Sequence, residues 1–193
     1  MLVQKYKNML SGKSVIRELS EFATARGQEI GYENVFDYSL GNPSVPVPEE
    51  FTEEMLRLLR EESTGTLHGY SPSLGIPQVR EAVAASLEKR FGLPYRKEHI
   101  FMAVGAAGAL AHAFRLATEP GDEILTFAPH FPEYHPYVDL TGAVLKVVPP
   151  DYENFQINFE KFEEMLTEKV MAVLINTPNN PSGVVYSGET LEK

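Results

Sequence analysis

Short apolar runs alternate with amphipathic stretches of helical period from about residue 98 onward. Strands that alternate with helices imply right-handed crossovers and a mainly parallel sheet. The expected strands are Ile100–Val104, Glu123–Phe127, Val144–Val148 and Val170–Ile175. The expected helices are Ala106–Thr118, Phe131–Leu140 and Phe159–Thr167. The pattern therefore predicts an α/β fold with a mainly parallel sheet and helices on both of its faces.

The first half of the chain has a less regular pattern. Apolar residues at helical spacing predict three further helices, at Val15–Ala25, Glu49–Arg60 and Ile76–Phe91. Gly92 is placed to cap the last of them. Gly41–Pro48 contains three prolines and is expected to be extended. The glycine- and serine-bearing stretch Thr64–Leu74 is expected to be a loop.

Composition narrows the class of protein. With 193 residues, of which 43% are hydrophobic, the chain can bury one core. A formal net charge of −10 argues against nucleic acid or an anionic membrane as a partner. The sequence has no cysteine, no apolar run long enough to cross a bilayer and no histidines at metal-ligand spacing. We expect a cytoplasmic protein without a metal site.

Gly105–Leu110, with the sequence GAAGAL, lies between an expected strand and an expected helix. It can offer bare backbone amides to a phosphate at a helix N-terminus, or it can allow close helix–sheet packing. A dinucleotide fingerprint is excluded, because the middle glycine and the acid at the end of the next strand are absent. A P-loop is excluded as well, because no Gly-Lys-Ser/Thr follows.

Two more loops follow expected strands. Pro129 and Pro132 bracket His130 and Phe131, so an aromatic ring is expected either at the rim of the sheet or in the core. Asn176–Gly183, with the sequence NTPNNPSG, is either an ordinary turn or a rigid platform whose second or third asparagine donates to an anionic oxygen. In parallel sheets, ligands bind outside the carboxyl ends of the strands. All three loops are expected on that rim.

The ordered set of motifs resembles the fold-type I aminotransferases of class I/II that use pyridoxal phosphate, and specifically their N-terminal portion. The resemblance extends over nearly the whole chain. The motifs that carry it are Leu40–Pro43, His68–Pro77, Arg80–Val83, Gly105–Leu110, Pro120–Glu123, Ala128–Tyr134 and Thr177–Gly183.

The resemblance implies roles for five residues in cofactor binding. Gly105, Ala106 and Ala107 would hold the phosphate of pyridoxal 5'-phosphate through their backbone amides. Phe131 would stack on the pyridine ring. Asn180 would donate to the phenolic oxygen of that ring. The protein would thus orient the cofactor while the cofactor supplies the electron sink.

The resemblance also implies a homodimer, in which Tyr70 reaches the phosphate in the neighbouring subunit. Gly41 would meet the substrate carboxylate. Residues 1–48 would contribute to a small domain and the subunit interface, and residues 49–193 would form part of the cofactor-binding large domain.

The family's Schiff-base lysine and pyridinium-binding aspartate would lie beyond Lys193. None of Lys146, Lys161 and Lys169 matches the family's motif, so no catalytic residue is assigned. We therefore expect this chain to be an N-terminal portion that lacks the C-terminal half of the large domain and is inactive alone.

The complete protein is expected to move an amino group between an amino acid and a 2-oxo acid. Two alternatives stay open at this point. One is a non-catalytic domain built from half of this fold. The other is a carbon–sulfur lyase or a decarboxylase with the same cofactor pocket.

Overall fold

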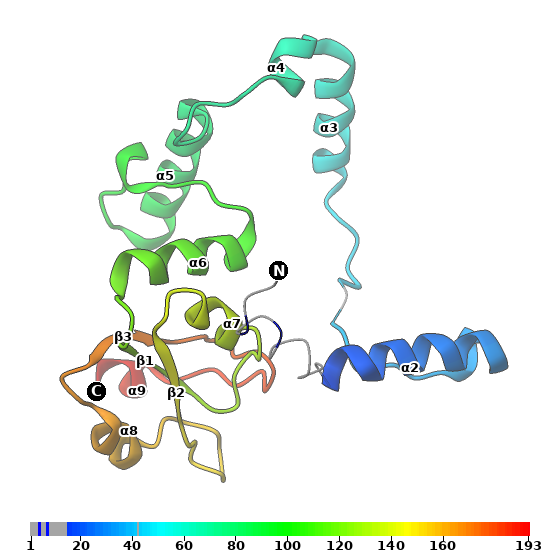
Figure 1. Ribbon diagram of the computed structural model, residues 1–193. Helices are drawn as coiled ribbons and strands as arrows, with labels where there is room; N and C mark the ends of the chain where they lie inside the picture. Colours follow the sequence, from blue (N-terminus) through cyan, green and yellow to red (C-terminus); the bar gives the residue numbers. More distant parts are fainter. Residues whose placement is uncertain (1–3, 5–6, 8–14, 42) are drawn as a thin grey trace. The chain divides into compact units, whose positions relative to one another are not determined.

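The computed structural model describes residues 4, 7, 15–41 and 43–193 (Figure 1). The chain divides into two compact units, Met1–Tyr70 and Ser71–Lys193. The described part of the first unit is helical, and the second unit contains the sheet. The roles assigned from the sequence to residues 1–48 and 49–193 stay predictions.

The first unit contains α2 (Val15–Ile30), η1 (Tyr32–Asn34), α3 (Glu49–Glu61) and α4 (Thr64–His68). The helices expected to begin at Val15 and Glu49 are confirmed, and α2 extends further than expected. The stretch Thr64–Leu74 was expected to be a loop, but it begins with the short helix α4. Its N-terminus is capped by Ser63, whose Oγ accepts the N–H of Thr66 at 3.2 Å. The described residues of Gly41–Pro48 are not helical, and Asn42 lies outside the described residues.

The sheet of the second unit has three parallel strands in the order β2–β1–β3. They are β1 (Glu123–Phe127), β2 (Val144–Val148) and β3 (Val170–Leu174). The central strand pairs Ile124 with Leu145 on one side and with Ala172 on the other. The parallel sheet and three of its four expected strands are confirmed.

Each face of the sheet is covered by its own apolar cluster. The first cluster joins β1 and β2 to α6 (Gly105–Ala117) and α7 (Tyr134–Asp139); its buried members are Phe114, Ile124, Tyr134, Val138, Ala143 and Leu145. The second cluster lies against α8 (Phe159–Met165); its buried members are Leu125, Phe127, Val148 and Tyr186. Ile124 and Leu125 are completely buried in opposite clusters, as the period of two along a strand requires. Helices on both faces are therefore confirmed (Figure 1).

The strand expected at Ile100–Val104 is wrong for the part of the chain that the structure describes. The segment has no regular secondary structure and belongs to no ladder, because a strand needs a hydrogen-bonded neighbour as well as an apolar sequence. Arg80 holds its start instead. The guanidinium donates from Nε to Ile100 O at 2.9 Å and from Nη2 to Lys97 O at 2.6 Å. Val104 remains 93% exposed.

The remaining helices of the second unit are α5 (Pro77–Phe91), η2 (Lys97–His99) and α9 (Gly188–Glu192). Gly92 ends α5 in the left-handed conformation, with φ 68°, and its N–H donates to Glu88 O. The predicted cap is therefore confirmed. No helix among the described residues is long and apolar enough to cross a membrane.

Candidate functional site

The loops that follow β1 and β3 leave the same edge of the sheet. The two strands are adjacent and parallel, so their carboxyl ends lie side by side. The first loop carries His130 and Phe131, and the second carries Asn176 to Gly183. Two of the three predicted site segments are thus brought together by strand pairing alone.

In the first loop, Phe131 is partly buried against the cluster formed by α6, α7 and the sheet. Its ring meets Tyr134 edge-on, with centroids 5.6 Å apart and planes at 79°. The sequence left open whether Phe131 lies in the core or at the rim of the sheet. The two positions are compatible, because core packing holds the ring while part of it stays accessible at the rim. The Ala128–Pro129 bond at the start of this loop is cis.

The two neighbouring asparagines of the second loop differ sharply. Asn179 is buried, and its Oδ1 accepts both the N–H of Ser182 at 3.1 Å and the hydroxyl of Ser182 at 2.8 Å. Its main chain is also engaged, since its N–H donates to Val184 O at 2.9 Å. Asn180 is exposed. Asn179 therefore builds the turn, whereas Asn180 is exposed and is free of that structural role; its predicted role in cofactor binding stays a prediction.

Tyr134 and Asn176 connect the two loops. With its amide oriented to satisfy its neighbours, Asn176 donates to Pro178 O at 3.2 Å. Its oxygen accepts the main-chain N–H of Asn180 at 3.0 Å and the hydroxyl of Tyr134 at 3.3 Å. Burial raises the pKa of the Tyr134 phenol, so the hydroxyl keeps its proton and acts as a donor. Sequence reasoning missed this contact.

The third segment begins α6. Gly105 has φ +66°, and a Cβ there would meet no atom within 4 Å, so backbone conformation favours glycine here. Its own N–H donates to Ala103 O at 3.1 Å, and that of Gly108 donates to Val104 O at 3.3 Å. The amides of Ala106 and Ala107 lie between these bonds at the positive end of a 13-residue helix.

This donor set fits a phosphate, because two main-chain amides of exposed small residues at a helix N-terminus suit an anion. Leu110, further along α6, packs against the same cluster as Phe131. The cluster therefore joins α6 to the first loop.

Tyr70 and Gly41 lie in the first unit. Tyr70 is fully exposed, and nothing lies within 4 Å of a Cβ placed on Gly41. The rim loops belong to the second unit. Their roles at the neighbouring site and at the substrate carboxylate stay predictions.

Of the three lysines that match no motif, Lys146 and Lys169 lie at the end of the sheet opposite the rim loops. Lys146 Nζ is 2.8 Å from Oε1 of Glu123, the residue that begins β1, so the pair sits at the amino edge of the sheet. Lys169 directly precedes β3 at that edge. Lys161 pairs along α8 with Glu164 at 2.8 Å.

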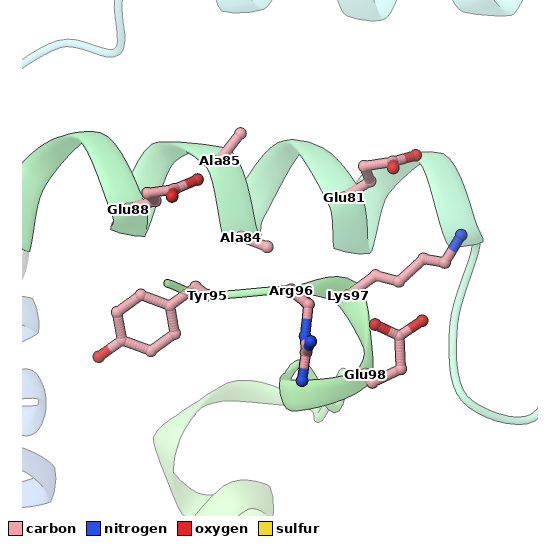
Figure 2. Close-up of a pocket in the computed structure, with 8 residues that line it drawn as sticks. All are labelled: Glu81, Ala84, Ala85, Glu88, Tyr95, Arg96, Lys97 and Glu98. Carbon is pink, nitrogen blue, oxygen red and sulfur yellow. The ribbon is translucent and has the colours of Figure 1, made fainter. Parts of the chain in front are cut away.

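A surface hollow of about 300 Å³ lies elsewhere, between α5 and residues 95–98 (Figure 2). Acidic and basic side chains both line it; they are Glu81, Glu88, Arg96, Lys97 and Glu98. No residue of the three predicted site segments contributes to this lining. The hollow is therefore separate from the candidate site.

His130 adds a titratable group beside Phe131. Its Nε2 is buried and has no hydrogen-bond partner among the described residues. Its ring stacks near Tyr134 and lies 5.2 Å from the ring of His135. Burial lowers the pKa of His130 below its usual 6.5, and the proximity of His135 lowers it further.

The free energy of unfolding should therefore fall as pH falls through the range just below 6.5. There the unfolded chain binds a proton at His130 that the folded chain rejects, so acid favours the unfolded state; the loss ends below the folded-state pKa. Urea titrations at pH 7.5 and 5.5 should show a smaller pH effect in His130→Gln. The exposed His112 provides the control, and His112→Gln should keep the wild-type slope. If the free energy of unfolding of His130→Gln changes with pH as much as that of the wild type, this interpretation of His130 is wrong.

Comparison with known proteins identifies the family. Residues 33–193 match the family model for aminotransferase class I and II. An aspartate aminotransferase of Thermotoga maritima is 34% identical over 188 residues, which cover 92% of this chain and 49% of the relative. A solved aminotransferase of Eubacterium rectale aligns with a TM-score of 0.93 at 39% identity over 100% of this chain and 48% of that one. For the Thermus thermophilus aspartate aminotransferase solved with maleate, the TM-score is 0.86 at 29% identity, with 100% and 48% covered.

The chain spans about half the length of the relatives it matches. The match covers all of the motifs from which the resemblance was drawn, and the solved structure from Eubacterium rectale aligns over 100% of this chain. This chain belongs to the class I and II aminotransferases.

Proposed function

We propose that the protein containing this chain transfers an amino group between an amino acid and a 2-oxo acid, with pyridoxal 5'-phosphate as its cofactor. The observation that carries the proposal is the meeting of the Phe131 and Asn180 loops at one sheet edge. Family membership supports it. When bound, the cofactor supplies an electron sink for negative charge that develops on the substrate.

The residues of this chain bind and orient that cofactor. The amides of Ala106 and Ala107 bind its phosphate, and the helix dipole of α6 adds to the attraction. Phe131 presents a ring face for stacking. The Asn180 amide donates to the phenolic oxygen and so favours its charged form.

The substrate is an amino acid, and aspartate is the first donor to test. The names of the relatives include aspartate, aspartate/prephenate and aromatic-amino-acid aminotransferases. The main-chain amide of Gly41 would meet the substrate carboxylate. Assays with aspartate and a 2-oxo acid should give the new amino acid. Release of sulfide from cysteine would instead favour a carbon–sulfur lyase, and release of carbon dioxide from the amino acid would favour a decarboxylase.

Replacing Asn180 with Ala in the protein made from its complete reading frame should weaken cofactor binding by about tenfold, because one hydrogen bond to a charged oxygen is lost. The absorption band of the bound cofactor should shift as well. Titration of the apo-protein with pyridoxal phosphate measures both effects. Asn154→Ala, at an exposed asparagine in the loop after β2, is the matched control and should change neither. Equal affinity in Asn180→Ala and the wild type would refute the site assignment.

The 193-residue chain should give no specific borohydride-reducible adduct with pyridoxal phosphate at Lys146, Lys161 or Lys169, and no amino transfer. Lys146 and Lys161 are held in ion pairs, and Lys146 and Lys169 lie at the end of the sheet opposite the rim loops. Mass spectrometry after borohydride reduction identifies any labelled lysine. A single labelled lysine together with turnover would overturn the assignment of the cofactor site to the rim.

The complete protein should sediment as a homodimer in which the exposed Tyr70 reaches the phosphate in the neighbouring subunit. A heterodimer of one Tyr70→Phe and one Asn180→Ala protomer then has one site with both changes and one intact site. It should be more active than either variant homodimer. Tyr38→Phe, at another exposed tyrosine of the first unit, is the control and should leave the activity of its homodimer unchanged. No recovery in the heterodimer, or full activity in a monomer, would contradict the shared site.

A further inference from the structure

Two side chains at the start of the second loop connect it to the core. Thr177 Oγ1 accepts the N–H of the buried Tyr186 at 3.0 Å, and Asn176 makes the second connection. Asn176 follows β3, and its amide makes three hydrogen bonds, to Pro178 O, the Asn180 N–H and the Tyr134 hydroxyl. An amide oxygen has two lone pairs, and both are used here. The position of the Asn180 main chain is therefore set by the position of the Asn176 amide.

Tyr134 anchors that amide to the rigid part of the fold. It begins α7, is only 6% exposed and belongs to the cluster that covers one face of the sheet. Its ring also contacts Phe131 edge-on at 5.6 Å. One buried tyrosine therefore contacts both the aromatic ring and, through Asn176, the asparagine that our proposed function assigns to the cofactor.

We propose that Tyr134 and Asn176 form a positioning pair that fixes the Asn180 amide relative to the Phe131 ring. This inference rests on the proposed function, because it assumes that both residues bind one planar ligand. Stacking sets the plane of that ligand, and the amide must then lie near the plane to donate to a ring oxygen. Tyr134 and Asn176 fix the Asn180 amide relative to the Phe131 ring, and neither of the two needs to touch the cofactor.

The pair explains why an exposed loop can hold a donor in place. Asn180 is exposed, and Thr177, Pro178, Pro181 and Ser182 around it are exposed as well. Packing therefore restrains this part of the loop little, and hydrogen bonds must do so. Asn179 closes the turn locally through Ser182, whereas Asn176 connects the turn to the core.

A double-mutant cycle in the protein made from its complete reading frame tests the pair. Pyridoxal phosphate is titrated into apo forms of the wild type, Tyr134→Phe, Asn180→Ala and the double variant. We expect Tyr134→Phe alone to weaken binding several-fold, roughly the effect of one neutral hydrogen bond. In the Asn180→Ala background the same change should have less than about a twofold effect, because the donor that it positions is gone.

The two possible failures differ in outcome. If Asn180→Ala weakens binding and Tyr134→Phe adds its full effect to it, or has none, the positioning pair is overturned while the proposed function stands. If Asn180→Ala leaves binding unchanged, the proposed cofactor site fails, and the pair fails with it.

Tyr186→Phe is the matched control. Tyr186 is 5% exposed in the other core cluster, so the variant removes a hydroxyl from a similarly buried tyrosine that is not a member of the pair. Its main-chain N–H, which donates to Thr177 Oγ1 at 3.0 Å, is kept. It should leave cofactor affinity and the absorption band unchanged, whereas Tyr134→Phe should shift the band in the same direction as Asn180→Ala. A general loss of core stability would affect both tyrosine variants alike.

A second measurement needs no cofactor. The Asn180 N–H donates to the Asn176 oxygen, so its hydrogen exchange should speed up at least several-fold in Asn176→Leu. Asn176→Asp keeps an accepting oxygen but loses the donor to Pro178 O, so its exchange should speed up less, and its affinity should fall less, than in Asn176→Leu. Unchanged exchange in Asn176→Leu, or equal losses of affinity in the two variants, would overturn the pair.

Discussion

The pairing of β1 with a parallel neighbour on each side determines where everything else lies. β1 and β3 run in the same direction with Ile124 opposite Ala172 and Thr126 opposite Leu174, so their carboxyl ends coincide. Thr126 strengthens this end of the sheet, since its buried hydroxyl donates to Leu174 O at 3.1 Å. Leu174 is the last residue of β3, and the second loop begins one residue later. The loop therefore starts from a point fixed by both main-chain and side-chain hydrogen bonds.

Beyond the carboxyl ends of the strands, a series of side-chain contacts connects the second loop to the core. The core cluster holds Tyr134, Tyr134 holds Asn176, and Asn176 holds the main chain of Asn180. Each link is a single contact between a more buried group and a less buried one. Through these contacts the buried core restrains the position of the exposed Asn180. Such a restraint is what the orientation of a planar ligand would require.

The sequence predicted what depends on local periodicity. The three strands have residues of the right type at the right spacing, and Gly92 ends α5 where a left-handed residue was expected. It failed at Ile100–Val104, where the apolar pattern fits a strand but pairing depends on a distant neighbour. It also missed α4, because the Ser63 cap outweighs the glycine-rich composition that follows it.

The candidate site was predictable to the level of loops but not of side-chain contacts. Tyr134 and Asn176 are 42 residues apart in the sequence, and no spacing rule relates them. Asn179 and Asn180 are the same residue type in adjacent positions, yet one is buried in the turn and the other is exposed. Only the path of the backbone between Pro178 and Pro181 separates the two roles. A single sequence contains no signal for that path.

The proposed anion site consists of backbone amides and not of lysine or arginine side chains, and electrostatics shows that such a site can suffice. The chain carries a formal charge of −10, which disfavours an anionic ligand at long range. At physiological ionic strength that repulsion is screened beyond about 8 Å, so only groups next to the ligand decide its binding. The Ala106 and Ala107 amides act within this range, and the α6 dipole adds to them. Lys146 and Lys161 are meanwhile held in ion pairs with Glu123 and Glu164. In the proposed site the phosphate would therefore be bound by main-chain amides, while these two amines stay paired with carboxylates.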